Sequence, residues 1–240
     1  MPTQVGIACP IPISDCFIQV SFCIPEIEPV FRKLWDMLIR QCPDLRELSI
    51  LTQGPDLIDS IDARLLFSGD HWPQLRFLEL GNIKVDPVLE DGDAHPFISF
   101  LSKRNHLRAL HFSGDFPPPS SHLARLPRDS LQELRYFSGS IDHLSSLPSV
   151  KNLLSIEIPN ALILREVTPL TITQALQAAP AVRSLKVSFV LQSGYDGIGI
   201  LRSIATAGAH IKHLDLTFSH KPSFYLVWLL DFSNTCVSTD

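Results

Sequence analysis

Apolar and polar residues recur along the chain in a six-residue phrase: an apolar residue, two mostly polar residues, an apolar, a polar and an apolar residue. The clearest copies are residues 45–50 and 75–80. Alternation in the last three places is typical of a strand with one buried face. The pattern predicts strands near residues 17–22, 45–50, 75–80, 107–112, 131–136, 153–158, 182–187 and 211–216. Their starts are 22 to 32 residues apart, which predicts a stack of repeating units.

Single matches to this phrase carry little weight, because 45% of the residues are hydrophobic. About a tenth of all windows would match by chance. The near-regular spacing carries more weight, and so does a second regularity. In six of the eight copies the second place holds a basic residue or glutamine: Arg46, Arg76, Arg108, Gln132, Arg183 and Lys212.

The segments between the predicted strands are long enough to return the chain along another layer. Apolar residues at helical spacing predict a helix over 28–40, with further helices over 57–67, 96–103, 171–179 and 199–207. The two short intervals contain 117–121 and 141–148. We expect an extended connection or a single 3₁₀ turn in each of them.

These phrases resemble the leucine-rich repeat, whose unit is L-x-x-L-x-L-x-x-(N or C)-x-L. The ninth place departs from that pattern, with Pro25, Gln53, Ile83, Asp115, Gly139, Ala161, Val190 and Ser219 in place of Asn or Cys. The openings Pro43-Asp44-Leu45-Arg46 and Pro73-Gln74-Leu75-Arg76 are similar to the ribonuclease-inhibitor-like repeats of fungal F-box proteins. The resemblance implies an α/β solenoid, a horseshoe or arc, with a parallel sheet on the concave face. Helices or irregular turns would form the convex face of one domain spanning residues 1–240.

Charge and composition limit the classes of partner and compartment. A net charge of −5 disfavours nucleic acid and anionic membranes as partners. Five cysteines without a C-x-x-C pair predict free thiols in a reducing compartment. No secretory signal is evident in residues 1–6, and the apolar segment 224–230 is too short to cross a bilayer. We therefore expect a cytoplasmic or nuclear protein.

Strand alternation also predicts which side chains are available for binding. Places four and six point into the stack, including Leu78 and Leu134, whereas places three, five and seven face the open side. Aromatic residues beside arginine favour a protein interface. The predicted protein-binding residues are Phe77, Glu79, His111, Arg135, Phe137, Glu157, Lys186 and Asp215. The alternative is that these are ordinary solvated strand positions, with Phe137 facing inward if its repeat slips.

No catalytic constellation, metal site or cofactor site is apparent in the sequence. We expect a non-catalytic module that binds a protein on its concave sheet. The resemblance implies the substrate-recognition part of a ubiquitin-ligase adaptor, with a Skp-type subunit as partner if a longer form carries an F-box, since none is found here. Two alternatives stay open: a fragment of a larger repeat protein, and an enzyme whose site combines His111, Glu157, His213 and Asp215.

Overall fold

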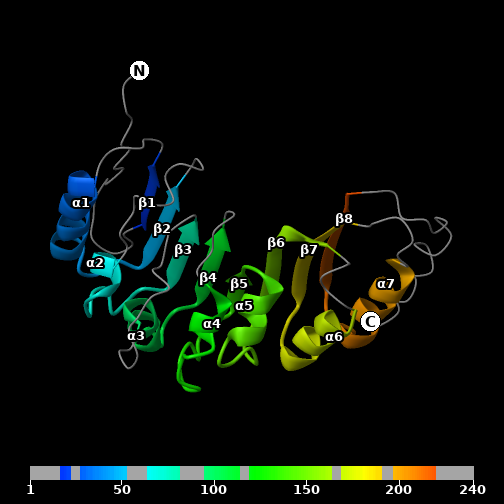
Figure 1. Cartoon of the computed structure of the whole chain (residues 1–240). Coiled ribbons are helices and arrows are strands. Elements are labelled where there is room, and N and C mark those ends of the chain that lie inside the picture. The colour runs from blue at the N-terminus through cyan, green and yellow to red at the C-terminus, as the bar shows by residue number, and fades with distance from the viewer. Residues whose placement is uncertain are drawn as a thin grey trace.

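The computed structural model describes residues 17–22, 28–52, 64–81, 95–113, 119–163, 169–190 and 197–219. Within these ranges the fold is α/β, with one sheet of eight parallel strands that follow one another in chain order. Figure 1 shows the strands as a continuous row, with helices along one side of it. The strands are β1 (Phe17–Phe22), β2 (Glu47–Thr52), β3 (Phe77–Gly81), β4 (Ala109–Ser113), β5 (Tyr136–Ser138), β6 (Ser155–Ile163), β7 (Ser184–Val190) and β8 (His213–Phe218).

Helices connect the successive strands, as parallel pairing requires. They are α1 (Glu28–Gln41), α2 (Arg64–Phe67), α3 (Pro96–Ser102), α4 (Ser120–Leu123), α5 (Ile141–Ser146), α6 (Pro169–Ala178) and α7 (Gly197–Ala207). The helices predicted over 28–40, 96–103, 171–179 and 199–207 are confirmed, and α2 coincides with the end of the one predicted over 57–67. No helix in the described part of the chain is long and apolar enough to span a bilayer.

The two short connections contain helices, which corrects the prediction of extended chain or a 3₁₀ turn. In α5, the Ser140 hydroxyl accepts a hydrogen bond from the backbone N–H of His143 at 3.2 Å. This N-cap satisfies one of the donors that a helix start leaves unpaired, which stabilises even a short helix. In α4, Ala124 N donates to the carbonyl of Ser120 at 3.4 Å, the spacing of four residues that an α-helical turn has.

The register of the sheet confirms that the leucine-bearing phrases lie side by side and run in the same direction. The fourth place forms one continuous row across the sheet when the fifth phrase is counted from Leu134 instead of Leu131. The row is Ile18, Leu48, Leu78, Leu110, Phe137, Ile156, Leu185 and Leu214. From Leu48 to Leu185 these side chains are buried. Each strand therefore covers the apolar edge of its neighbour.

A tight turn precedes each strand from β2 to β8. The backbone N–H of the first-place residue donates to the carbonyl three residues earlier, at 2.8 to 3.3 Å. The first-place residues are Leu45, Leu75, Leu107, Leu134, Leu153, Val182 and Ile211. Two of the residues whose carbonyl accepts these bonds, Trp72 and Leu131, have positive φ angles of 55° and 57°. Bulky residues rarely adopt this conformation, and here the buried side chains of both residues hold it in place.

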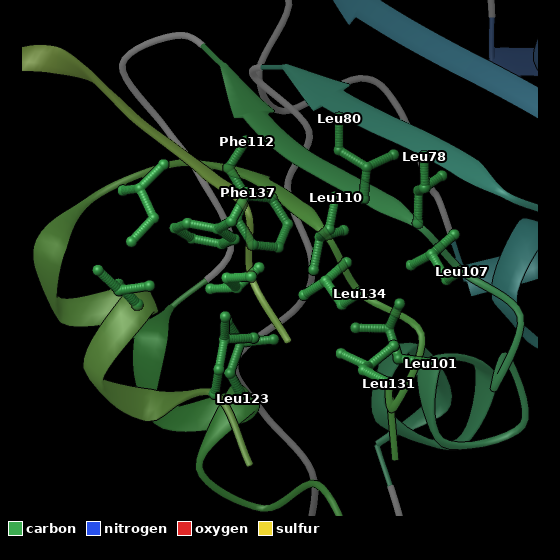
Figure 2. Packing of buried hydrophobic residues seen from close by; sticks show 14 of the residues in the cluster. Leu78, Leu80, Leu101, Leu107, Leu110, Phe112, Leu123, Leu131, Leu134 and Phe137 are labelled. Atoms are coloured by element: carbon green, nitrogen blue, oxygen red, sulfur yellow. The ribbon is translucent and has the colours of Figure 1, made fainter. Parts of the chain in front are cut away.

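The core lies between the sheet and the helices. Figure 2 shows Leu78, Leu80 and Leu110 from the sheet near Leu101 and Leu123 from the helical side. The rings of Phe112 and Phe137 lie beside each other, with centroids 6.3 Å apart in a T-shaped arrangement. Edge-to-face packing of this kind adds to the free energy gained by burial.

The fifth strand differs from its predicted position. The sequence pattern predicted a strand over 131–136, whereas β5 is Tyr136–Ser138 and Leu131 belongs to the turn before it. Both Leu131 and Leu134 begin an apolar-x-x-apolar match, three residues apart. The observed register buries Leu131, Leu134 and Phe137 together, and it leaves Tyr136 at the surface. The alternative would have exposed Phe137, which is less favourable because Phe has no polar group to hydrate.

The segment 224–230 and four of the five cysteines predicted to be thiols lie outside the described residues. Cys42 lies within them and is a thiol that is partly buried.

Candidate protein-binding face

The candidate site is the face of the sheet opposite the helices, called the open face below. Third-place and fifth-place side chains of each phrase point to it because residues alternate between the two sides of a strand. The fifth-place row is Ser49, Glu79, His111, Ser138, Glu157, Lys186 and Asp215. The third-place row is Glu47, Phe77, Ala109, Tyr136, Ser155, Ser184 and His213.

Polar and charged side chains of the fifth-place row form contacts between neighbouring strands. Ser49 Oγ donates to Glu79 Oε2 at 2.6 Å, and Lys186 Nζ lies 2.7 Å from Glu157 Oε1. The hydrogen bond from Lys186 to Glu157 raises the pKa of Lys186, with the charges of Glu157 and Asp215 acting in the same direction. This ion pair is solvent-exposed, so it orients the two side chains more than it stabilises the fold.

His111 lies between two carboxylates of the same row. Its pKa is lowered because burial disfavours the imidazolium form, although the charges of Glu79 and Glu157 act in the opposite direction. The ring packs against Phe77 from the neighbouring strand, with centroids 4.9 Å apart and a T-shaped geometry. The neutral ring, held against Phe77, gives this part of the face an apolar surface with hydrogen-bonding capacity.

Two aromatic side chains flank a small one in the third-place row. Ala109 of β4 pairs with Phe77 of β3 on one side and with Tyr136 of β5 on the other. Tyr136 is 48% exposed, one of the most exposed large hydrophobic side chains of the described residues. A tyrosine in this setting offers both apolar area and a hydroxyl, a combination that protein interfaces favour.

Most of the predicted binding residues lie together on this face. Phe77, Glu79 and His111 occupy neighbouring positions on β3 and β4. Glu157, Lys186 and Asp215 occupy neighbouring positions on β6, β7 and β8, and β5 separates the two groups. Their role in binding stays a prediction.

The fifth strand changes the remaining assignments. Phe137 was predicted to be a binding residue, but it is 2% exposed and belongs to the core, so its predicted position is wrong. Arg135 is exposed and precedes β5 at the edge of the sheet. In the observed register Tyr136 faces the open side, whereas the predicted register had placed it in the core. The signal that identifies it is the second-place arginine: counting from Arg135 puts Tyr136 in the third place.

The two histidines of the enzymatic alternative lie on strands that are far apart in the sheet. His111 is on β4 and His213 is on β8, so four strand spacings separate them, about 19 Å. Side chains at that separation cannot act on the same bond. Among the residues that the structure describes, no group of three or more His, Cys, Asp or Glu side chains is placed to hold a metal ion.

Acidification should destabilise the fold in part through His111. The unfolded chain takes up a proton near the ordinary pKa of 6.5, whereas the folded chain takes it up only at lower pH. The contribution to stability is therefore complete above about pH 6.5 and is lost as the pH falls through the folded pKa. We expect the urea midpoint of unfolding to fall less between pH 7 and pH 5 in His111→Gln than in the wild type.

His213→Gln is the matched control, because His213 is an exposed histidine on the same face. Its pH dependence should follow that of the wild type. If the urea midpoint fell equally between pH 7 and pH 5 in the wild type and in His111→Gln, burial of His111 would not favour its neutral form.

Comparison of the chain with protein-family models gives no match, and comparison with curated proteins gives none either.

Proposed function

We propose that the chain is a leucine-rich repeat module that binds a protein partner on the open face of its sheet. The observation that carries the proposal is the common geometry of successive units from β2 to β8. Each has the same tight turn before the strand and parallel pairing with its neighbour, and the first place is buried from β2 to β7 and partly buried before β8. A stack of this kind presents one side chain per unit at equivalent positions, which makes a broad surface for docking.

The composition of the open face supports a protein as the partner. Phe77, His111 and Tyr136 form an aromatic group near its centre, with Glu79 and Glu157 beside it. Interfaces concentrate their binding energy in a few aromatic residues surrounded by polar ones. The mixed charges of the fifth-place row would then determine which partner fits.

Truncation of the aromatic group should abolish binding while leaving the fold intact. We expect Phe77→Ala/Tyr136→Ala to weaken a specific partner by at least about 30-fold, the effect of losing one strong interface residue. The measurement is affinity purification with quantitative mass spectrometry, followed by titration of the partner recovered. The control is Arg128→Ala/Arg202→Ala, which alters two exposed residues away from the open face.

A partner that is recovered equally by both variants would place the binding surface elsewhere on the molecule. The same purification tests the extension of the proposal to a ubiquitin-ligase adaptor. A Skp-type subunit among the partners of a longer form would support that extension, and its absence would leave the binding module as the proposed function.

A further inference from the structure

A row of cations runs along the edge of the sheet at which the strands begin. The residue immediately before the strand is basic in six of the seven strands from β2 to β8. These residues are Arg46, Arg76, Arg108, Arg135, Arg183 and Lys212, with Leu154 before β6. The first four belong to consecutive strands, and they are called the arginine edge below.

Backbone hydrogen bonds place these residues directly beside one another. Arg76 N donates to Arg46 O at 2.7 Å, Arg108 N to Arg76 O at 2.7 Å, and Arg135 N to Arg108 O at 2.8 Å. The four arginines therefore succeed one another at the spacing of paired strands, about 4.8 Å, and span about 14 Å. Arg108 and Arg135 are exposed, and Arg46 and Arg76 are half-buried.

The turn itself does not require a cation at this position. Leu154 makes the same contacts: its N–H donates to Arg135 O at 2.7 Å, and its carbonyl accepts from Arg183 N at 2.7 Å and Ser184 N at 3.1 Å. The backbone geometry is thus independent of the charge. Like charges on neighbouring strands repel one another, which lowers the stability of the isolated fold.

For Arg76, Arg108 and Arg135, neighbouring carboxylates of the described ranges compensate the charge only in part. Arg108 Nε lies 3.7 Å from Glu133 Oε2, in an exposed pair. Within the described ranges, no carboxylate lies within ion-pair distance of Arg76 or Arg135. A chain with a net charge of −5 therefore concentrates positive charge along one edge.

The backbone spacing of the arginines favours one class of anionic partner. Carboxylates on one face of an α-helix repeat about every 5.4 Å, close to the strand spacing of about 4.8 Å. Carboxylates on one face of an extended peptide repeat about every 6.6 Å, which over three intervals exceeds the backbone span of the arginine edge by about 5 Å. A helix also carries its charge on one face only. It can therefore avoid Glu79 and Glu157 of the adjoining open face, whereas a nucleic acid exposes phosphates on both sides.

We propose that Arg46, Arg76, Arg108 and Arg135 form a docking edge for an acidic amphipathic α-helix of a protein partner. The guanidinium group pairs with a carboxylate through two parallel hydrogen bonds, which lysine cannot reproduce. This inference rests on the proposed function in that the partner is a protein, but it uses a different set of residues from the aromatic group of the open face.

The probe is a fluorescein-labelled synthetic peptide of about 20 residues, with glutamates every three or four positions on one face, Ala and Gln elsewhere, and blocked ends. Its counterpart has the same composition in an order that spreads the glutamates around the helix. Binding is measured by fluorescence anisotropy at low and at physiological salt. We expect the one-faced peptide to bind at least about tenfold more tightly, and its affinity to fall with salt.

Arg76→Gln/Arg135→Gln should weaken the one-faced peptide by about tenfold or more, because each lost bond to a charged group contributes a large share of the affinity. Arg76→Lys/Arg135→Lys keeps the charge and should give an intermediate loss. Arg128→Gln/Arg202→Gln removes two exposed arginines away from this edge and should bind as the wild type does. Thermal unfolding of each variant establishes that it is folded.

Three results would overturn the proposal. The two peptides could bind equally, the control variant could lose affinity as much as the edge variant, or a 20-base-pair DNA duplex could bind more tightly than the one-faced peptide. None of these would affect the role proposed for Phe77 and Tyr136, because partner capture on the open face is measured with those residues alone.

Discussion

Phe137→Ala is expected to lower the free energy of unfolding by about 3 to 5 kcal/mol. Phe137 is 2% exposed and packs edge to face against Phe112. Its ring also fills the space beside Gly139, where an added Cβ would lie 2.9 Å from Phe137 Cζ. Removal of the ring leaves a cavity that neighbours fixed on two adjacent strands cannot fill. Urea denaturation, analysed with the slope as well as the midpoint, measures the loss.

Tyr136→Ala is the matched control for this experiment. Tyr136 is adjacent in sequence, is of similar size and lies on the opposite face of the same strand. Its removal should change the free energy of unfolding by less than about 1 kcal/mol. If instead Tyr136→Ala destabilised the protein and Phe137→Ala did not, the fifth strand would have the register that the sequence pattern first predicted.

The arrangement of the strands follows from the sequence to a large extent. The phrases that begin at Leu45, Leu75 and Leu107 each carry an arginine in second place, and this basic residue identifies the start of the strand. Their adjacency, parallel direction and buried face are confirmed. The phrase that begins at Leu134 overlaps a second match from Leu131. Apolar spacing alone favours the wrong start, because Leu131 completes the phrase with Tyr136 whereas Leu134 puts Gly139 in the sixth place.

The basic residue in second place does distinguish them. A start at Leu131 gives Gln132 in that position, whereas a start at Leu134 gives Arg135 and restores the arginine of the three preceding units. The first four places of the phrase are apolar-x-x-apolar for both starts, so they do not decide between them. The residue at the edge reports where the strand begins, so the combination of the two signals predicts the fifth strand correctly.

How far the residues of the open face could be predicted also depended on the register of each strand. Phe77, Glu79 and His111 were placed correctly because alternation within a strand needs no knowledge of its neighbours. The cross-strand contacts are different: Ser49 with Glu79, Lys186 with Glu157, and the ring of His111 with Phe77. These contacts, and the lowered pKa of His111, follow from pairing between units 29 to 34 residues apart, which the sequence of one unit does not contain.

The second large effect is expected for Leu78→Ala, which should lower the free energy of unfolding by about 2 to 5 kcal/mol. Leu78 is fully buried, and in the fourth-place row it lies between Leu48 and Leu110. Both neighbours belong to strands that are themselves paired on their far sides, so the cavity cannot close without moving the sheet. Thermal and urea unfolding should report the same loss if the described units unfold together.

Leu214→Ala makes the same change at the same place of the phrase, on β8. Leu214 is 36% exposed, so less apolar surface returns to water, and the expected cost is below about 1.5 kcal/mol. Glu79→Ala, one residue from Leu78 but on the open face, should cost less than about 1 kcal/mol. An equal loss for Leu78→Ala and Leu214→Ala would mean that burial does not differ between β3 and β8. In that case the end of the sheet must be covered in solution as fully as its centre.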